Sequence, residues 1–205
     1  MSENNKVKAI VFDIGNVLVD FRYEEHFKQF VSSQEEWERL VQATVLSNGW
    51  CELDRGVLSD EEILDEFIAN DPEIEGILRM MFSNMDGILQ MRDFAIPLVE
   101  ELKGYGYEVI ALSNMPHKMI RECNRDLHFL EHMTGAILSC EEQCVKPEKQ
   151  IYKKLLSKYH LKGEECIFID DLPKNIEAAR EVGFYGICYG SYEQMREEMK
   201  SIIGR

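Results

Sequence analysis

The sequence predicts an α/β fold in which a doubly wound parallel sheet carries an inserted helical subdomain. Along most of the chain, short apolar segments alternate with amphipathic helical patterns, which is typical of a parallel sheet covered by helices on both faces. Residues 21–92 interrupt this alternation with helical patterns alone. We therefore expect a core formed by residues 1–20 and 93–205 and an insert formed by residues 21–92.

Five segments have the continuous apolarity of strands that are buried on both faces. They are 8–14 (KAIVFDI), 107–113 (YEVIALS), 135–139 (GAILS), 166–170 (CIFID) and 185–189 (YGICY). Helical patterns occupy 147–160 and 175–184, and a third helix is expected after Ser191, which forms a capping box with Gln194. Strands and helices thus alternate as the fold requires.

The pattern of the insert predicts four amphipathic helices and no strand. The first lies near 23–31. The second starts at Ser33 and the third at Ser59, and each of these serines is followed three residues later by a glutamate that completes a capping box. The fourth starts at Asp71, which precedes a proline. We expect these helices to cover the carboxyl ends of the strands, where open α/β sheets bind ligands.

Composition excludes several classes of partner. The net charge of −15 opposes binding to nucleic acid or to an anionic membrane surface, because both require a basic patch. No apolar run reaches the roughly 18 residues that span a bilayer, and residues 1–8 lack the apolar stretch of a secretory signal. The six cysteines form no CxxC pair, as expected for free thiols in a reducing compartment. We expect a cytoplasmic monomer or homodimer.

Polar side chains lie at the carboxyl ends of three predicted strands, and a lysine precedes a predicted helix. These residues are Asp13, Ser113, Asn114, Asp170, Asp171 and Lys146. Because the carboxyl ends of parallel strands converge on one crevice, we expect them to meet there. Three carboxylates at close range raise one another's pKa unless cations join them. Lys146 supplies one positive charge, and the oxygen ligands suit Mg²⁺ better than zinc.

Such a set of groups is suited to phosphoryl transfer. Mg²⁺, Lys146 and Ser113 together would neutralise the charge on phosphoryl oxygens. Asp13 can attack phosphorus and form an aspartyl-phosphate, which water then hydrolyses. Gly15 follows Asp13 by two residues, and we expect it to let the backbone turn sharply and to offer its carbonyl to the metal. The substrate would be a small phosphorylated molecule.

Four segments in this order resemble the motifs of the haloacid dehalogenase (HAD) superfamily of hydrolases. They are VFDIGNVLVD (11–20), ALSN (111–114), VKPEKQIY (145–152) and FIDDLPKNIEAAR (168–180). The resemblance implies a Rossmann-like core with a four-helix cap inserted after the first motif. It also implies a Mg²⁺-dependent phosphatase of a small phosphorylated metabolite.

The resemblance assigns roles by position in the motifs. Asp13 matches the nucleophile and a metal ligand, and Lys146 matches the charge-neutralising lysine. Ser113 matches the phosphate-binding residue, and Asn114 beside it is predicted to bind substrate. The remaining matches concern the metal. Gly15 matches the residue that offers its carbonyl to the metal, and Asn175 matches a supporting polar residue. Asp170 and Asp171 match the acidic pair, of which Asp171 is favoured as the direct ligand.

The sequence departs from the family at Gly15, where phosphatases of the family usually carry a second aspartate that protonates the leaving group. General acid–base catalysis is typically worth about 10²–10⁴-fold. Members that read FD-x-GNV resemble glucose-1-phosphatase-like enzymes, and a hemiacetal leaving group of a hexose 1-phosphate needs less protonation than an alcohol. Alternatively, water or a residue of the cap supplies the proton, and the candidates are His26, Glu52, Asp54 and Arg55.

Three other functions are compatible with parts of this pattern. A haloacid dehalogenase uses the same nucleophilic aspartate but needs no metal, so the acidic pair Asp170 and Asp171 counts against it. A catalytically weak protein that binds a phosphorylated ligand or a protein partner would explain Gly15. In a phospho-accepting signalling receiver the acidic pair comes early in the chain, so the order of motifs here argues against that class.

Overall fold

The computed structural model describes residues 7–204. Residues 1–6 of the predicted core, which include most of the stretch assessed for a secretory signal, and Arg205 lie outside that range. A five-stranded parallel sheet with the order β5-β4-β1-β6-β7 forms the centre of the molecule. The strands are β1 (Ala9–Phe12), β4 (Glu108–Ser113), β5 (Gly135–Leu138), β6 (Cys166–Asp170) and β7 (Tyr185–Cys188). The predicted α/β fold and its five strands are confirmed.

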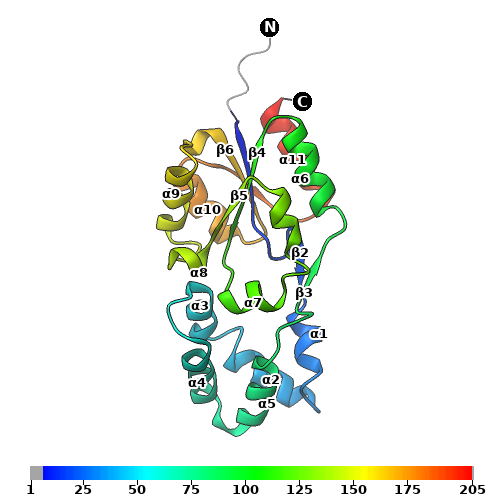
Figure 1. The fold of residues 1–205 in the computed structure, drawn as a ribbon, viewed down its shortest axis with the longest axis vertical. Helices are drawn as coiled ribbons and strands as arrows, with labels where there is room; N and C mark the ends of the chain where they lie inside the picture. The colour runs from blue at the N-terminus through cyan, green and yellow to red at the C-terminus, as the bar shows by residue number, and fades with distance from the viewer. Residues whose placement is uncertain (1–6, 205) are drawn as a thin grey trace.

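Helices cover both faces of this sheet (Figure 1). They are α9 (Lys149–Lys158) and α10 (Pro173–Glu181) on one face, and α6 (Ala95–Gly104) and α11 (Tyr192–Ile203) on the other. Successive side chains of β1 point to opposite faces, so Ala9 and Val11 join the core under α9 and α10, while Ile10 and Phe12 join the other. Burial on both faces explains the continuous apolarity of this strand.

Five α-helices lie between β2 and β3 in the chain and form a separate layer beside the sheet's carboxyl edge (Figure 1). We call them the helical layer: α1 (Tyr23–Lys28), α2 (Gln34–Ala43), α3 (Asn48–Arg55), α4 (Asp60–Asn70) and α5 (Glu75–Phe82), with the 3₁₀ turn η1 (Pro72–Ile74) before α5. The hydroxyls of Ser33 and Ser59 accept hydrogen bonds from the backbone N–H of Glu36 and Glu62, as predicted. Helix α3 was not among the predicted helices.

A short antiparallel ribbon flanks the helical layer. It pairs β2 (Val19–Phe21) with β3 (Leu89–Met91). The expectation that residues 21–92 contain no strand is therefore wrong. Each strand has only three residues, and their pairing joins segments about 70 positions apart in the chain, so neither shows a periodic pattern of its own.

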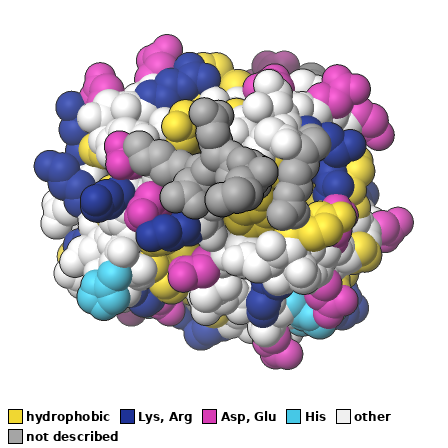
Figure 2. Space-filling model, turned by 90° about the horizontal axis from the view of Figure 1, so that it is seen from above, with side chains coloured by type: hydrophobic (Ala, Val, Ile, Leu, Met, Phe, Trp, Pro, Cys, Tyr) yellow, Lys and Arg dark blue, Asp and Glu magenta, His cyan; other side chains and the backbone are white. Residues whose placement is uncertain are grey.

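The remaining helices are short connections around the sheet. They are α7 (His117–Glu122), α8 (Ser139–Glu142) and the 3₁₀ turns η2 (His128–His132) and η3 (Gly163–Glu165). No helix within residues 7–204 combines the length and apolarity needed to cross a membrane. Figure 2 shows the end of the molecule farthest from the helical layer, where acidic and basic side chains are interspersed.

Candidate active site

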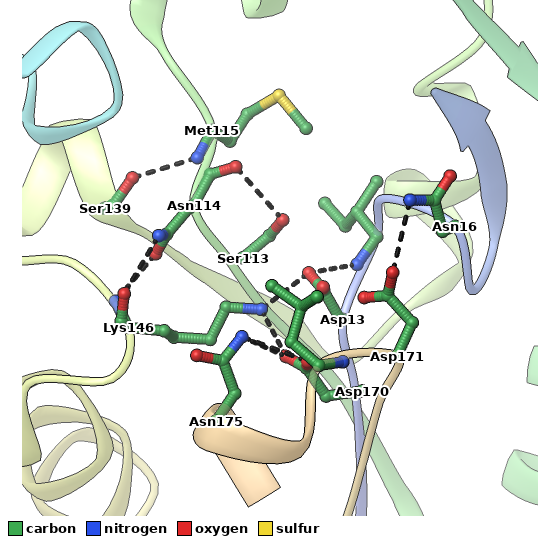
Figure 3. A network of polar contacts seen from close by, with 12 residues as sticks. Asp13, Asn16, Ser113, Asn114, Met115, Ser139, Lys146, Asp170, Asp171 and Asn175 are labelled. Atoms are coloured by element: carbon green, nitrogen blue, oxygen red, sulfur yellow. Dashed lines mark hydrogen bonds and ion pairs between the residues drawn. The ribbon is translucent and has the colours of Figure 1, made fainter. Parts of the chain in front are cut away.

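A buried lysine joins two carboxylates at the carboxyl ends of β1 and β6. Lys146 Nζ lies 2.7 Å from Asp13 Oδ1 and 2.7 Å from Asp170 Oδ2. All three side chains are buried, and Figure 3 shows Lys146 reaching between the two acids. The predicted convergence of these strand ends is therefore present in the fold, although Lys146 itself comes from the loop between α8 and α9.

Asp170 serves as the fixed partner of this lysine. Asn175 Nδ2 donates to both carboxylate oxygens at 3.0 Å, and the backbone N–H of Leu172 donates to Oδ1 at 2.8 Å. With Lys146 on Oδ2, both oxygens of Asp170 are engaged. Asn175 thus has the supporting role that the motif implied, because it orients Asp170 from the first turn of α10.

The carboxylate of Asp13 lies at the carboxyl end of β1. Its Oδ1 accepts a hydrogen bond of 2.7 Å from the backbone N–H of Ile14. Burial raises the pKa of Asp13 to about 7; Lys146 and the Ser113 hydroxyl oppose this rise, whereas the charge of Asp170 adds to it. The site therefore concentrates more negative charge than Lys146 alone offsets, which favours a bound cation.

Three carboxylates offer oxygen atoms to such a cation. Oxygens of Asp13, Asp170 and Asp171 all lie within 4.8 Å of one another. Asp170 already uses both oxygens. Asp171 is half-buried, and among the described residues Asn16 is the one whose side chain donates to its carboxylate, with Nδ2 3.2 Å from Oδ2. An all-oxygen donor set of this kind fits Mg²⁺, and the free lone pairs favour Asp13 and Asp171 over Asp170 as its direct ligands.

The turn after β1 depends on Asn16 rather than Gly15. Asn16 has the left-handed φ of 55°, a conformation that asparagine tolerates better than most residues, and Gly15 does not. Asn16 also accepts a hydrogen bond from the N–H of Phe21 at 3.2 Å and donates to Asp171. Gly15 lies within the same turn, which the Val17 N–H closes by donating to the Ile14 carbonyl at 3.3 Å, although the left-handed residue of the turn is Asn16. An added Cβ at Gly15 would meet no atom within 4 Å.

Asn114 binds the main chain of Lys146. Its Oδ1 accepts a hydrogen bond of 2.7 Å from the Lys146 N–H, and its Nδ2 donates to the Lys146 carbonyl at 3.1 Å (Figure 3). The side-chain amide therefore positions the lysine. Ser113, which ends β4, lies on the wall of the cavity beside Asp13. Substrate binding by Ser113 and Asn114 stays a prediction.

A cavity of about 540 Å³ opens above these groups. On the sheet side it is lined by Asp13, Gly15, Asn16, Ser113, Asn114, Lys146, Asp171, Lys174 and Asn175. An apolar group of side chains also lines it, namely Phe21, Val45, Trp50, Leu89, Met115 and Met119. Polar residues of α3 also reach it: Cys51, Asp54 and Arg55. The cavity therefore pairs a charged end with a largely apolar wall.

Helix α3 is fixed to the core at its C-terminal end. Gly56 ends the helix with φ 72°, and an added Cβ there would lie 2.5 Å from Cys140 Cβ. The hydroxyl of Ser139 donates to the Asp54 carbonyl at 2.5 Å, and Arg55 Nη2 lies 2.9 Å from Glu148 Oε1. These contacts place α3 directly against α8 (Figure 1).

Of the four residues suggested as proton donors, the structure brings two to the cavity. Asp54 and Arg55 line it, and His26 and Glu52 do not. His26 is buried and its Nε2 lies 3.1 Å from the Asn84 carbonyl. Glu52 pairs with Arg55 on the same helix. Recognising Asp54 and Arg55 as cavity residues requires α3 and its contact with α8, neither of which the sequence analysis found.

Residues 7–183 match the family model of the haloacid dehalogenase-like hydrolases. The chain belongs to this family. The predicted resemblance is confirmed, and the fold and the order of motifs agree with it. The protein is thus a HAD-like hydrolase.

Similar proteins include phosphatases. Flavin mononucleotide hydrolase 1 of Arabidopsis thaliana, a chloroplastic protein, is 24% identical over 75% of this chain, and the match spans 61% of that relative. A sesquiterpene phosphatase of Aspergillus oryzae is 25% identical over 96% of this chain and 97% of its own length. A HAD family enzyme of Bacteroides thetaiotaomicron, solved with magnesium and inorganic phosphate, superposes with a TM-score of 0.67 at 19% identity, over 92% of this chain and 98% of that one.

Proposed function

We propose that this protein is a Mg²⁺-dependent phosphomonoesterase that acts through an aspartyl-phosphate on Asp13. One observation carries the proposal. Lys146 binds Asp13 and Asp170 at 2.7 Å in a buried site, beside Asp171 and at the floor of a cavity. A carboxylate nucleophile, a fixed ammonium and oxygen ligands for a divalent ion are the groups that phosphoryl transfer needs. The names of the relatives support the same class of reaction.

Each residue has a part in this scheme. Asp13 attacks phosphorus, and Lys146 offsets the charge on the phosphoryl oxygens and on Asp13. The hydroxyl of Ser113, which lines the same cavity, would donate to a phosphoryl oxygen. Asp13, Asp171 and the Gly15 carbonyl would hold Mg²⁺, with Asp170 and Asn175 behind them. The metal, when bound, supplies Lewis-acid stabilisation of the developing negative charge.

The apolar wall indicates the kind of organic group that the substrate carries. Phe21 and Val45 offer no hydrogen bonds to a polyol, and Trp50 offers only its indole N–H. Of the polar groups nearby, Arg55 is paired with Glu148 and the Ser47 hydroxyl donates to the Thr44 carbonyl. A phosphate ester with an apolar or aromatic face is therefore a better match than a free sugar phosphate. Two relatives are named for molecules of that kind, flavin mononucleotide and sesquiterpenes, whereas a third is named for a polyol ester, D-ribitol 5-phosphate.

The hexose 1-phosphate predicted from FD-x-GNV remains the alternative substrate. Release of inorganic phosphate should be measured from terpenyl and flavin monophosphates and from hexose 1- and 6-phosphates, with Mg²⁺ and with EDTA. Metal-dependent release that favours the apolar esters supports the proposal. Preference for a hexose 1-phosphate would contradict the assignment from the apolar wall, and equal rates in EDTA would contradict the metal.

The proposal includes two further points from the sequence. We propose that the helical layer is a cap over the active site and that the substrate is a small molecule rather than a nucleic acid or a membrane surface. A haloacid dehalogenase or a catalytically weak binding protein would give no phosphate from any ester in the panel. Chloride release from 2-chloropropionate, measured in the same preparation, separates those two outcomes.

A further inference from the structure

We propose that Asp54 of helix α3 is the acid–base residue of this hydrolase: it protonates the leaving oxygen and then activates water. The inference rests on the proposed phosphatase function and names the residue that performs the task left open at Gly15. Asp54 lines the same cavity as Asp13 and approaches it from the helical layer. Its carboxyl group would face the organic half of a phosphate ester whose phosphorus lies at Asp13.

The hydrogen-bond partners of the other acids leave Asp54 as the available one. Four carboxylates line the cavity: Asp13, Asp54, Glu148 and Asp171. Asp13 is bound to Lys146, Asp171 to Asn16 and Glu148 to Arg55. Within residues 7–204, no donor forms a hydrogen bond or ion pair with the Asp54 carboxylate. The contact that Ser139 makes with Asp54 is to its backbone carbonyl. A cavity-lining acid with no protein partner is free to exchange a proton with substrate and water.

The backbone of Asp54 is held as firmly as a general acid requires. Ser139 Oγ donates to its carbonyl and accepts a hydrogen bond of 2.9 Å from the Met115 N–H, so it links α3 to the segment after β4. On the next two residues, Arg55 is paired with Glu148, and Gly56 lies against Cys140. A carboxyl group on this rigid end of α3 has the precise placement that proton transfer needs.

The electrostatic surroundings of Asp54 suit the same task. Burial raises its pKa to about 7, and the negative charge of Asp13 adds to this, while Lys146 opposes it. An acid that titrates near neutral pH can both donate and accept a proton during one catalytic cycle.

The two steps balance in atoms and charge. As Asp13 bonds to phosphorus, the bond from phosphorus to the ester oxygen breaks, and that oxygen takes the proton of Asp54 to leave as an alcohol. Asp54 is then a carboxylate. It accepts a proton from the water that attacks the aspartyl-phosphate, which frees the Asp13 carboxylate and inorganic phosphate and returns Asp54 to its protonated form.

A comparison of leaving groups tests this role. p-Nitrophenolate is a weak base and leaves without being protonated. Hexanol is a poor leaving group unless its oxygen receives a proton as the bond to phosphorus breaks. The value of kcat/KM depends only on the steps up to the first irreversible one, which here is the loss of the alcohol. The later attack of water on the aspartyl-phosphate therefore does not affect it. Asp54→Asn should lower kcat/KM for hexyl phosphate by about 10²-fold or more and for p-nitrophenyl phosphate by less than about tenfold. The control is Asp65→Asn, the same substitution on the exposed face of α4, which should change neither value.

A second variant restores the missing group from the opposite wall. Because Gly15 has open space around its Cβ position and no left-handed φ, Gly15→Asp can place a carboxyl group beside Asp13. The double variant Asp54→Asn with Gly15→Asp should have a kcat/KM for hexyl phosphate at least tenfold higher than that of Asp54→Asn alone. Urea unfolding of every variant establishes that each is folded.

The outcomes separate the inference from the proposed function. Equal losses on both esters, or no loss on hexyl phosphate, would overturn the role of Asp54 while leaving the phosphatase intact. Silence of the wild-type protein on both esters would contradict the proposed function itself, and the inference would fall with it.

Discussion

Lys146 Nζ and Asp13 Oδ1 form a buried ion pair at 2.7 Å, and the same ammonium binds Asp170 at the same distance. One cation therefore faces two carboxylates, with Asp171 close by. The pairing fixes Asp13, the proposed nucleophile, and leaves net negative charge for a metal to balance.

Replacing the lysine should affect activity and stability together. Lys146→Met leaves two buried carboxylates without their shared cation, and removing one partner of a buried ion pair typically costs about 3–5 kcal/mol. We expect that loss in the free energy of unfolding from urea titration, and a fall in kcat of about 10²-fold or more. Lys153→Met, an exposed lysine of α9, is the control. Equal stability of the two variants would contradict the pairing.

Asn114 should act through the position of Lys146. Asn114→Ala removes both hydrogen bonds to the Lys146 main chain, at a cost of about 1–3 kcal/mol. If the residue only positions the lysine, kcat falls while KM for the substrate is unchanged. A rise in KM with constant kcat would instead support the predicted role in substrate binding. Steady-state kinetics on p-nitrophenyl phosphate distinguish the two.

The contact between α3 and α8 should depend on the absence of a side chain at Gly56. Gly56→Ala places a Cβ 2.5 Å from Cys140 Cβ, in a backbone with φ 72°. Gly87→Ala is a matched control, because Gly87 has φ 85° but nothing within 4 Å of its Cβ position. Strain from a positive φ alone is about 1–2 kcal/mol. We expect Gly56→Ala to lose clearly more stability than Gly87→Ala in urea titrations, and comparable losses would refute the close approach.

Stability should depend on pH through Asp54. Its pKa is raised from 3.8 to about 7 in the folded protein, so above pH 4 the unfolded chain binds fewer protons there than the folded one. The contribution of Asp54 to stability therefore falls as pH rises from about 4 to 7 and is constant above that. In EDTA, the free energy of unfolding of wild type should fall relative to that of Asp54→Asn as the pH rises through this range. A constant difference from pH 5 to 8 would contradict the raised pKa.

The sequence predicted those parts of the molecule that depend on local pattern. The meeting of Asp13 and Asp170 was predicted because each lies at the carboxyl end of a continuous apolar strand, and parallel strands end at one edge. Helix α3 was missed because its eight residues include Gly49 and only a few apolar positions. Its place against the core depends on Gly56 and Cys140, which are far apart in the chain, so no local signal marks it.

The finer geometry of the site depended on contacts that no pattern reveals. Gly15 was expected to let the backbone turn sharply, but Asn16 takes the left-handed conformation in that turn, and its amide reaches Asp171. Asn114 was assigned to substrate by its place beside Ser113, whereas its amide is used by Lys146. In both cases the residue type was noticed, but its partner lies on another strand or loop and emerges only from the packed fold.

The most direct test of the account is a search for the phosphoryl group on Asp13. Wild-type protein mixed with Mg²⁺ and p-nitrophenyl phosphate is quenched in acid within one turnover, digested and analysed by mass spectrometry, beside Asp13→Asn. The account predicts a phosphoryl group on the peptide that contains Asp13 in the wild type, and neither phosphorylation nor turnover in the variant. Phosphate release by Asp13→Asn at the wild-type rate, with no phosphorylated peptide in either protein, would contradict it.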